Sequence, residues 1–98
     1  MTLPAPAPGT TVVFQAWVGP RPPRFIERCL ATTLSWARSR GFDYRMLGDE
    51  FFDVLPGWYR ESMAAHIVQQ TDLARLRYAR ELIAAGAARA VWIDADVL

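Results

Sequence analysis

Two aspartates follow the last hydrophobic run of the chain. Val91-Trp92-Ile93 is typical of a strand, and Asp94-Ala95-Asp96 comes directly after it. On an extended backbone, residues two apart point to the same side, so we expect the carboxylates of Asp94 and Asp96 to lie close together. Such carboxylates repel each other unless a proton or cation lies between them, and their oxygens suit Mg²⁺ or Mn²⁺. The pair predicts a divalent-ion site that presents a phosphorylated ligand. The alternative is a strand that runs into an acidic turn, and the two aspartates alone favour neither.

The elements that must position these carboxylates alternate between strand and helix. Gly41 and Gly86 are suited to end helices, and prolines precede the first one. Alternation of this kind favours a parallel α/β sheet, in which ligands bind beyond the carboxyl ends of the strands. The expected elements are strand 11–18, helix 23–40, strand 42–47, a helical turn at 50–54, helix 58–70, a helix from Thr71 to Gly86, and strand 89–93.

Two of the expected helices have apolar positions at three- and four-residue spacing, which predicts the faces that they bury. In the second of them, Thr71 or Asp72 is a suitable N-terminal cap. The first helix should bury Ile26, Cys29, Leu30, Thr33, Leu34 and Ala37, and the second Leu73, Leu76, Ala79, Leu82 and Ile83.

Length and composition narrow the class of protein. The chain has 98 residues with 52% hydrophobic content, which is enough for one small packed domain. A net charge of +1 with interspersed signs argues against nucleic acid as a partner. The single cysteine, Cys29, excludes an internal disulfide and fits a reducing compartment, so we expect a cytoplasmic location. Residues 1–11, rich in proline, are expected to form a flexible tail, and no segment has the pattern of a signal peptide or a membrane span.

Three segments occur in an order that resembles a known family. They are Phe14-Gln15-Ala16-Trp17-Val18-Gly19, then Thr71-Asp72-Leu73-Ala74-Arg75, then Trp92-Ile93-Asp94-Ala95-Asp96-Val97. In this order and spacing they resemble GT-A-fold glycosyltransferases, most closely the bacterial family-32-like sugar transferases with a DxD-containing sugar-binding region. The clostridial glucosylating toxins are more distantly similar. The resemblance covers residues 12–98 and implies a metal-dependent transfer of sugar from a nucleotide-sugar donor, with a UDP-sugar expected.

The resemblance also implies roles for individual residues. Trp17 matches the aromatic residue that stacks on the nucleotide base, so its ring should reach the same mouth as Asp94. Asp72 and Arg75 match an Asp-x-x-Arg pair that approaches the donor sugar, expected at the start of the helix before the DxD strand. Asp94 matches the carboxylate that contacts ribose or sugar. Asp96 matches the ligand of Mn²⁺ or Mg²⁺.

The elements that come after the DxD strand in that family have no counterpart within the 98 residues. The expected fold is therefore a partial GT-A (Rossmann-like) parallel sheet with flanking helices, truncated after the DxD strand. Residues 12–98 would be the N-terminal, donor-binding part of the domain, and the acceptor is unknown. We expect an incomplete sheet to expose an edge through which the chain self-associates.

Simpler interpretations stand beside these. Trp17 fits an ordinary core residue, and Asp72 with Arg75 fits a helix cap and a surface ion pair. The functional alternatives are a non-catalytic nucleotide-binding or interaction fragment and a haloacid-dehalogenase-like phosphatase. The phosphatase ranks lower because its Asp-x-Asp motif normally follows the first strand, whereas Asp94 follows the third.

Overall fold

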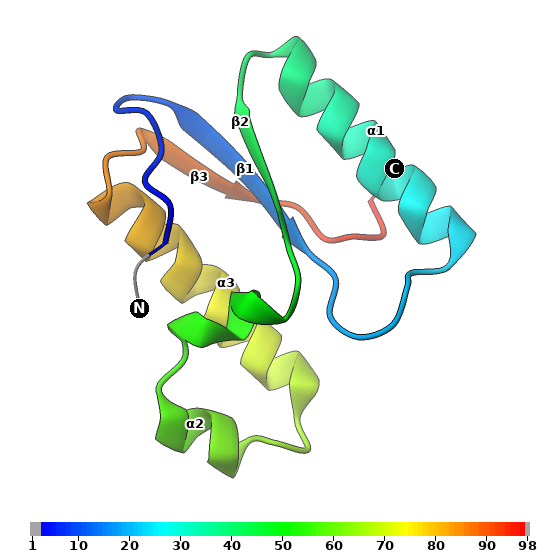
Figure 1. The fold of residues 1–98 in the computed structure, drawn as a ribbon, viewed down its shortest axis with the longest axis vertical. Coiled ribbons are helices and arrows are strands. Elements are labelled where there is room, and N and C mark those ends of the chain that lie inside the picture. Colours follow the sequence, from blue (N-terminus) through cyan, green and yellow to red (C-terminus); the bar gives the residue numbers. More distant parts are fainter. Residues whose placement is uncertain (1–2, 98) are drawn as a thin grey trace.

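The computed structural model describes residues 3–97, and its sheet has the predicted parallel topology (Figure 1). The three strands lie in the order β2-β1-β3, and both pairings are parallel. The α/β class with helices flanking a parallel sheet is therefore confirmed. In chain order the elements are β1 (Thr11–Ala16), α1 (Arg24–Ser39), β2 (Asp43–Leu47), the 3₁₀ helix η1 (Asp49–Val54), α2 (Gly57–Ser62), α3 (Ile67–Ala84) and β3 (Arg89–Trp92).

Strand β1 is the centre of the sheet. Its register places Val13 opposite both Tyr44 of β2 and Val91 of β3. The four residues Val12–Gln15 are fully buried, since strands flank both edges of β1 and helices lie on both sides of the sheet (Figure 1). Strands β2 and β3 are outer strands among the described residues, and β3 is only half-buried.

Alternation along β1 divides the interior into two layers. Val12 and Phe14 belong to the larger core cluster, which η1 and α3 complete with Phe51, Tyr78 and other side chains. The aromatic rings form a continuous group: Phe14 lies 5.2 Å from Tyr78 and 5.4 Å from Trp92 between ring centroids, and Phe51 stacks on Trp92 at 5.3 Å.

Helix α1 follows its predicted pattern closely. It buries Ile26, Cys29, Thr33 and Ala37, four of the six residues expected to face the core. Gly41, just past the helix, has φ +71°, a left-handed conformation that suits glycine and ends the helix as expected.

The predicted helix 58–70 is wrong, and so is the predicted helix start at Thr71. The structure divides this region into α2, a turn over residues 63–66, and α3 beginning at Ile67. The carbonyl of Met63 accepts hydrogen bonds from the His66 backbone N–H (2.8 Å) and from the Gln70 side chain (2.7 Å). These bonds close the turn and fix where α3 begins, so Asp72 lies in its second turn rather than at its N-terminus.

The predicted apolar face of α3 is partly wrong as well. Leu76 is 67% exposed and Ile83 48% exposed, although both were expected in the core. The buried positions follow a four-residue spacing that includes one polar side chain and one tyrosine. They are Gln70, Ala74, Tyr78 and Leu82.

Part of the N-terminal segment expected as a flexible tail packs against the domain. The last residue of that segment already belongs to β1, and the Gly9 N–H donates to the Gly86 carbonyl at 3.0 Å. Pro6 is buried, and Arg45 donates a hydrogen bond to the Pro4 carbonyl. These contacts attach residues 3–10 to the sheet and to the end of α3. Residues 1 and 2 of the predicted tail, and residue 98 of the predicted domain, lie outside the described part of the chain.

Over residues 3–97, no helix combines the length and hydropathy needed to cross a membrane. The longest, α3, carries charged side chains at Asp72, Arg75, Arg77, Arg80 and Glu81.

We predict that Phe51→Ala removes most of the stability of the domain. Phe51 is fully buried against Trp92 and Tyr78, and deleting a buried phenylalanine costs about 3–5 kcal/mol. That cost is comparable to the whole stability of a small domain. Urea denaturation followed by far-UV circular dichroism measures it.

The matched control is Phe25→Ala, since Phe25 is 62% exposed. This variant should stay within about 0.5 kcal/mol of wild type. Equal losses of stability in both variants would contradict the position of Phe51 at the centre of the core.

Candidate functional site

Trp17 and Asp94 line one cavity at the carboxyl ends of β1 and β3. Its volume is about 280 Å³, and Phe51, Ile67 and Thr71 are among its other lining residues. Trp17 is partly exposed, and its Nε1 donates to the Pro20 carbonyl at 2.7 Å. Its ring therefore lies at the mouth shared with Asp94 and is not enclosed in the core. This is the edge of a parallel sheet at which ligands ordinarily bind.

The carboxylate of Asp94 is held from two sides. Its Oδ1 accepts a hydrogen bond from Trp92 Nε1 at 2.7 Å and lies 4.0 Å from Arg75 Nη1. Arg75 Nη2 in turn lies 3.4 Å from Asp72 Oδ1. Arg75 thus contacts two carboxylates: that of Asp72, its partner in the Asp-x-x-Arg pair, and that of Asp94. Because these side chains are substantially exposed, each ion pair contributes little stability, and their main effect is to orient Asp94.

The five predicted site residues are not all brought together. Trp17 and Asp94 share the cavity, and Arg75 contacts Asp94. Asp72 reaches the group only through Arg75 and lines a separate shallow cavity beside Leu76. Asp96 is exposed and makes no ion pair or side-chain hydrogen bond within residues 3–97.

The backbone that carries the two aspartates is not extended. Strand β3 ends at Trp92, and the Val97 N–H donates to the Asp94 carbonyl at 3.2 Å, which closes a turn over residues 94–97. The expectation that strand alternation aligns Asp94 and Asp96 is therefore wrong. Instead, the strand runs into an acidic turn, as in the alternative interpretation of the sequence. The turn, and not strand alternation, sets the directions of the two carboxylates.

Gln15 is a positioning residue that the sequence interpretation missed. It is fully buried, its Oε1 accepts from the Tyr44 hydroxyl at 2.6 Å, and its Nε2 donates to the Asp94 carbonyl at 3.4 Å. One chain of hydrogen bonds therefore links β2, β1 and the turn after β3. The available signal was a polar residue within the apolar run Val-Val-Phe-Gln-Ala, since a buried amide requires partners.

The site offers a limited set of metal ligands. Within the described residues, no group of three or more His, Cys, Asp or Glu side chains could hold an ion. Magnesium, however, is often bound through one or two carboxylates together with substrate phosphates. Asp96 is exposed, and Asp94 Oδ1 is taken by Trp92 and Arg75. The donor set therefore fits an ion shared with a phosphorylated ligand and does not fit a closed protein cage.

Comparison with known proteins gave no match: no family model, curated protein or solved structure is significantly similar to this chain.

We predict that Tyr44 makes folding sensitive to alkaline pH. Burial raises the pKa of the Tyr44 phenol above its ordinary value of about 10. The folded state therefore holds this proton more tightly than the unfolded state does. The resulting stability is present below about pH 10 and is lost as pH rises through the folded pKa. Urea midpoints measured between pH 8 and pH 11 should fall more steeply for wild type than for Tyr44→Phe.

Tyr59→Phe is the control for this experiment, because Tyr59 lies on α2, away from the hydrogen-bond chain. It should keep the wild-type pH dependence. If the urea midpoint of Tyr44→Phe falls with pH as steeply as that of wild type, a group other than Tyr44 causes the alkaline loss of stability.

Proposed function

We propose that residues 12–98 bind the donor of a metal-dependent glycosyltransferase, with a nucleoside-diphosphate sugar, expected to be a UDP-sugar, as ligand. The observation that carries the proposal is the cavity shared by Trp17 and Asp94 at the carboxyl end of a parallel sheet. Arg75 on the adjacent helix, in contact with Asp94, supports it. The motif order Trp17, Asp72-x-x-Arg75, Asp94-x-Asp96 supports it independently of the geometry.

In this proposal each side chain has a distinct task. The Trp17 ring stacks on the base, since its Nε1 bond to Pro20 fixes the indole while leaving part of it exposed. Asp94 accepts hydrogen bonds from ribose or sugar hydroxyls through its free oxygen, Oδ2. Arg75 contacts that carboxylate and orients it, and Asp72 contacts Arg75 in turn. The cavity, at about 280 Å³, is just below the usual range for ligand pockets, so it accommodates only part of a nucleotide sugar.

Asp96 is the residue that would hold Mn²⁺ or Mg²⁺ together with the diphosphate. When bound, the ion supplies charge neutralisation for the departing nucleoside diphosphate. The exposure of Asp96 at the tip of the turn is compatible with sharing an ion with a ligand outside the protein surface. A cytoplasmic location also belongs to the proposal, supported by Cys29, which is a buried free thiol on α1.

We predict that UDP binds only in the presence of Mn²⁺ or Mg²⁺ and that two variants separate the tasks. Asp96→Asn removes one negative charge without changing size, so it should abolish the metal dependence and weaken binding at least about tenfold. Asp94→Asn should weaken UDP binding less and keep the metal requirement. Isothermal titration of UDP with and without MnCl₂ measures both.

Glu61→Gln is the matched control, since Glu61 is an exposed acid on α2 outside the described cavities. It should bind UDP as wild type does. Equal UDP affinity in all variants would refute the proposed site. Metal-independent binding in wild type would favour a nucleotide-binding fragment without transferase chemistry.

A further inference from the structure

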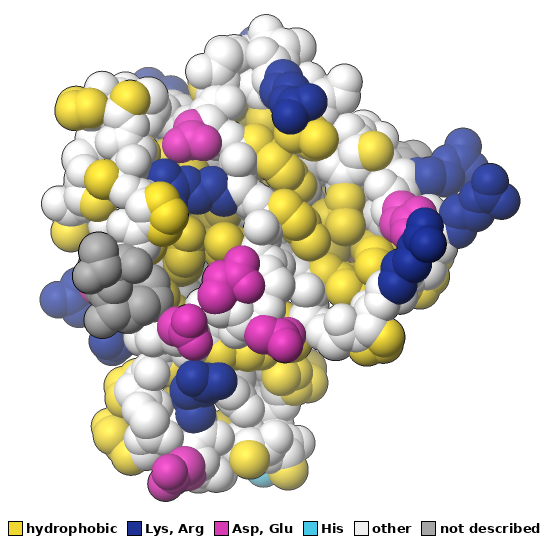
Figure 2. Space-filling model, viewed as in Figure 1, with side chains coloured by type: hydrophobic (Ala, Val, Ile, Leu, Met, Phe, Trp, Pro, Cys, Tyr) yellow, Lys and Arg dark blue, Asp and Glu magenta, His cyan; other side chains and the backbone are white. Residues whose placement is uncertain are grey.

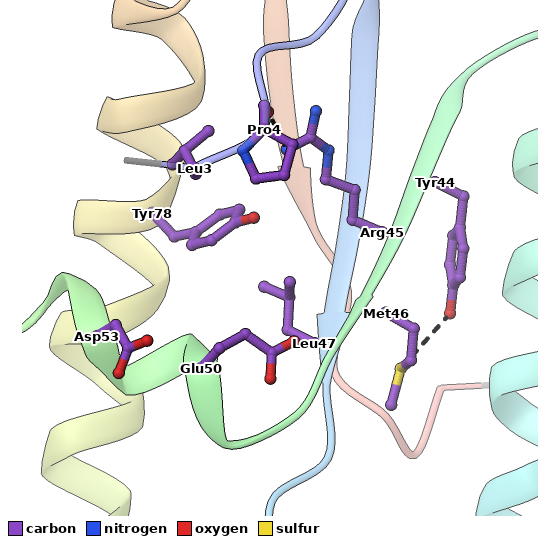
Figure 3. Close-up of a pocket in the computed structure, with 9 residues that line it drawn as sticks. All are labelled: Leu3, Pro4, Tyr44, Arg45, Met46, Leu47, Glu50, Asp53 and Tyr78. Atoms are coloured by element: carbon purple, nitrogen blue, oxygen red, sulfur yellow. Dashed lines mark hydrogen bonds between the residues drawn. The ribbon is translucent and has the colours of Figure 1, made fainter. Parts of the chain in front are cut away.

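A second, larger cavity lies between the N-terminal segment, β2, η1 and α3, apart from the Trp17 mouth. Its volume is about 520 Å³, within the range of small-molecule pockets, and it shares no lining residue with the Trp17–Asp94 cavity. Figure 3 shows Leu3 and Pro4 at one end, Glu50 and Asp53 at the other, and Tyr78 extending from α3 between them.

Tyr78 brings an unpaired polar group to this cavity. The residue is only 3% exposed, and its ring packs against Phe14 and Phe51. Its hydroxyl points away from α3 into the cavity (Figure 3), and it makes no hydrogen bond to any residue from 3 to 97. No buried side-chain oxygen or nitrogen in that range lacks a partner, so this hydroxyl reaches the open space of the cavity. A tyrosine hydroxyl at the wall of a cavity is available to hydrogen-bond with a ligand that enters it.

Of the charged side chains that line the cavity, the arginine already has partners, whereas the two acids are largely available to a ligand. The cationic lining residue, Arg45, already has Asp43 at 3.5 Å and the Pro4 carbonyl as partners. The carboxylate of Glu50 accepts one backbone hydrogen bond, from Gly48 at 3.0 Å through Oε1. Among the described residues, the ion-pair partner of Asp53 is Arg60, through a long, exposed contact of 3.6 Å. Figure 2 shows acidic side chains gathered over this part of the surface, so the η1 end of the cavity is electronegative.

We propose that this cavity binds a small ligand with an apolar body and a protonated amine. The apolar body lies against Leu3, Pro4 and Leu47, and the ammonium group faces Glu50 and Asp53. The Tyr78 hydroxyl hydrogen-bonds to a polar atom of the ligand. This inference does not depend on the proposed transferase function, since the two cavities are separate.

The test uses three probes of similar size and different charge on the ¹⁵N-labelled chain at pH 7. They are 2-phenylethylamine (cationic), 2-phenylethanol (neutral) and phenylacetate (anionic). Amide shift titrations should show saturable changes at Leu47, Glu50 and Tyr78, not at Trp17 or Asp94. The amine should bind about threefold more tightly than the alcohol, as expected for partly exposed charge pairs, and the acetate most weakly. Added salt should reduce the difference.

Variants then assign the effect to residues. The double variant Glu50→Gln with Asp53→Asn should bind amine and alcohol equally. Tyr78→Phe keeps the ring and removes the hydroxyl, so it should weaken both ligands while keeping their order. Asp49→Asn is the matched control, an acid of η1 that does not line the cavity, and should leave the preference unchanged.

The amide spectrum of each variant reports whether it folds, so a loss of binding is separated from a loss of structure. Three results would overturn the proposal. The amides that line the cavity could show no saturable shift, or phenylacetate could bind as tightly as the amine or more tightly. The third is a preference for the amine that survives in the double variant.

Discussion

The structure depends on the complete burial of β1 between two parallel neighbours. A strand in this position must satisfy every backbone and side-chain polar group internally, because water does not reach it. Gln15 meets that requirement by bonding to Tyr44 on one side and to the Asp94 carbonyl on the other. The same bonds that satisfy a buried amide therefore fix the turn carrying Asp94 to the centre of the sheet. The position of the candidate site is therefore set by hydrogen bonds made from the core.

Helix α3 connects the two cavities. Tyr78 contacts Phe14 of β1, and the Arg77 Nε donates to the Val54 carbonyl of η1 at 2.7 Å. These contacts fix the rotation of the helix, which directs Arg75 toward Asp94 and the Tyr78 hydroxyl into the larger cavity. Because one rigid helix presents both groups, a change that rotates α3 should disturb both cavities together.

Local patterns were sufficient to predict the strands, α1 and the parallel topology. The β1 and β3 runs are strongly apolar, and α1 has an unambiguous face. They were insufficient for α3, in which apolar residues occur on every side. The predicted face used the large aliphatic residues Leu76 and Ile83, whereas the structure buries Gln70 and Tyr78. That choice follows from the Gln70 bond to Met63 and from the aromatic group around Phe14, which are tertiary contacts that periodicity does not contain.

For the candidate site, too, some features were predictable from the sequence and others were not. The family resemblance predicted that Trp17 and Asp94 share one mouth, and the structure agrees because the carboxyl ends of the adjacent parallel strands β1 and β3 meet there. The sequence pattern failed for the relation between Asp94 and Asp96, since the strand ends two residues before Asp94 and a turn replaces the extended backbone. The role of Gln15 was also not predicted, because its partner in the turn lies 79 residues away along the chain.

The central claim is that a nucleoside diphosphate and a divalent ion bind together at the carboxyl ends of β1 and β3. Paramagnetic broadening of backbone amides by Mn²⁺, with Mg²⁺ as the diamagnetic reference, locates the ion directly. In the presence of UDP, we expect the strongest broadening at residues 94–97, weaker broadening at Trp17, and little effect at either set without UDP. Broadening centred on Glu50 and Asp53, or unchanged by UDP, would contradict joint binding at this edge of the sheet.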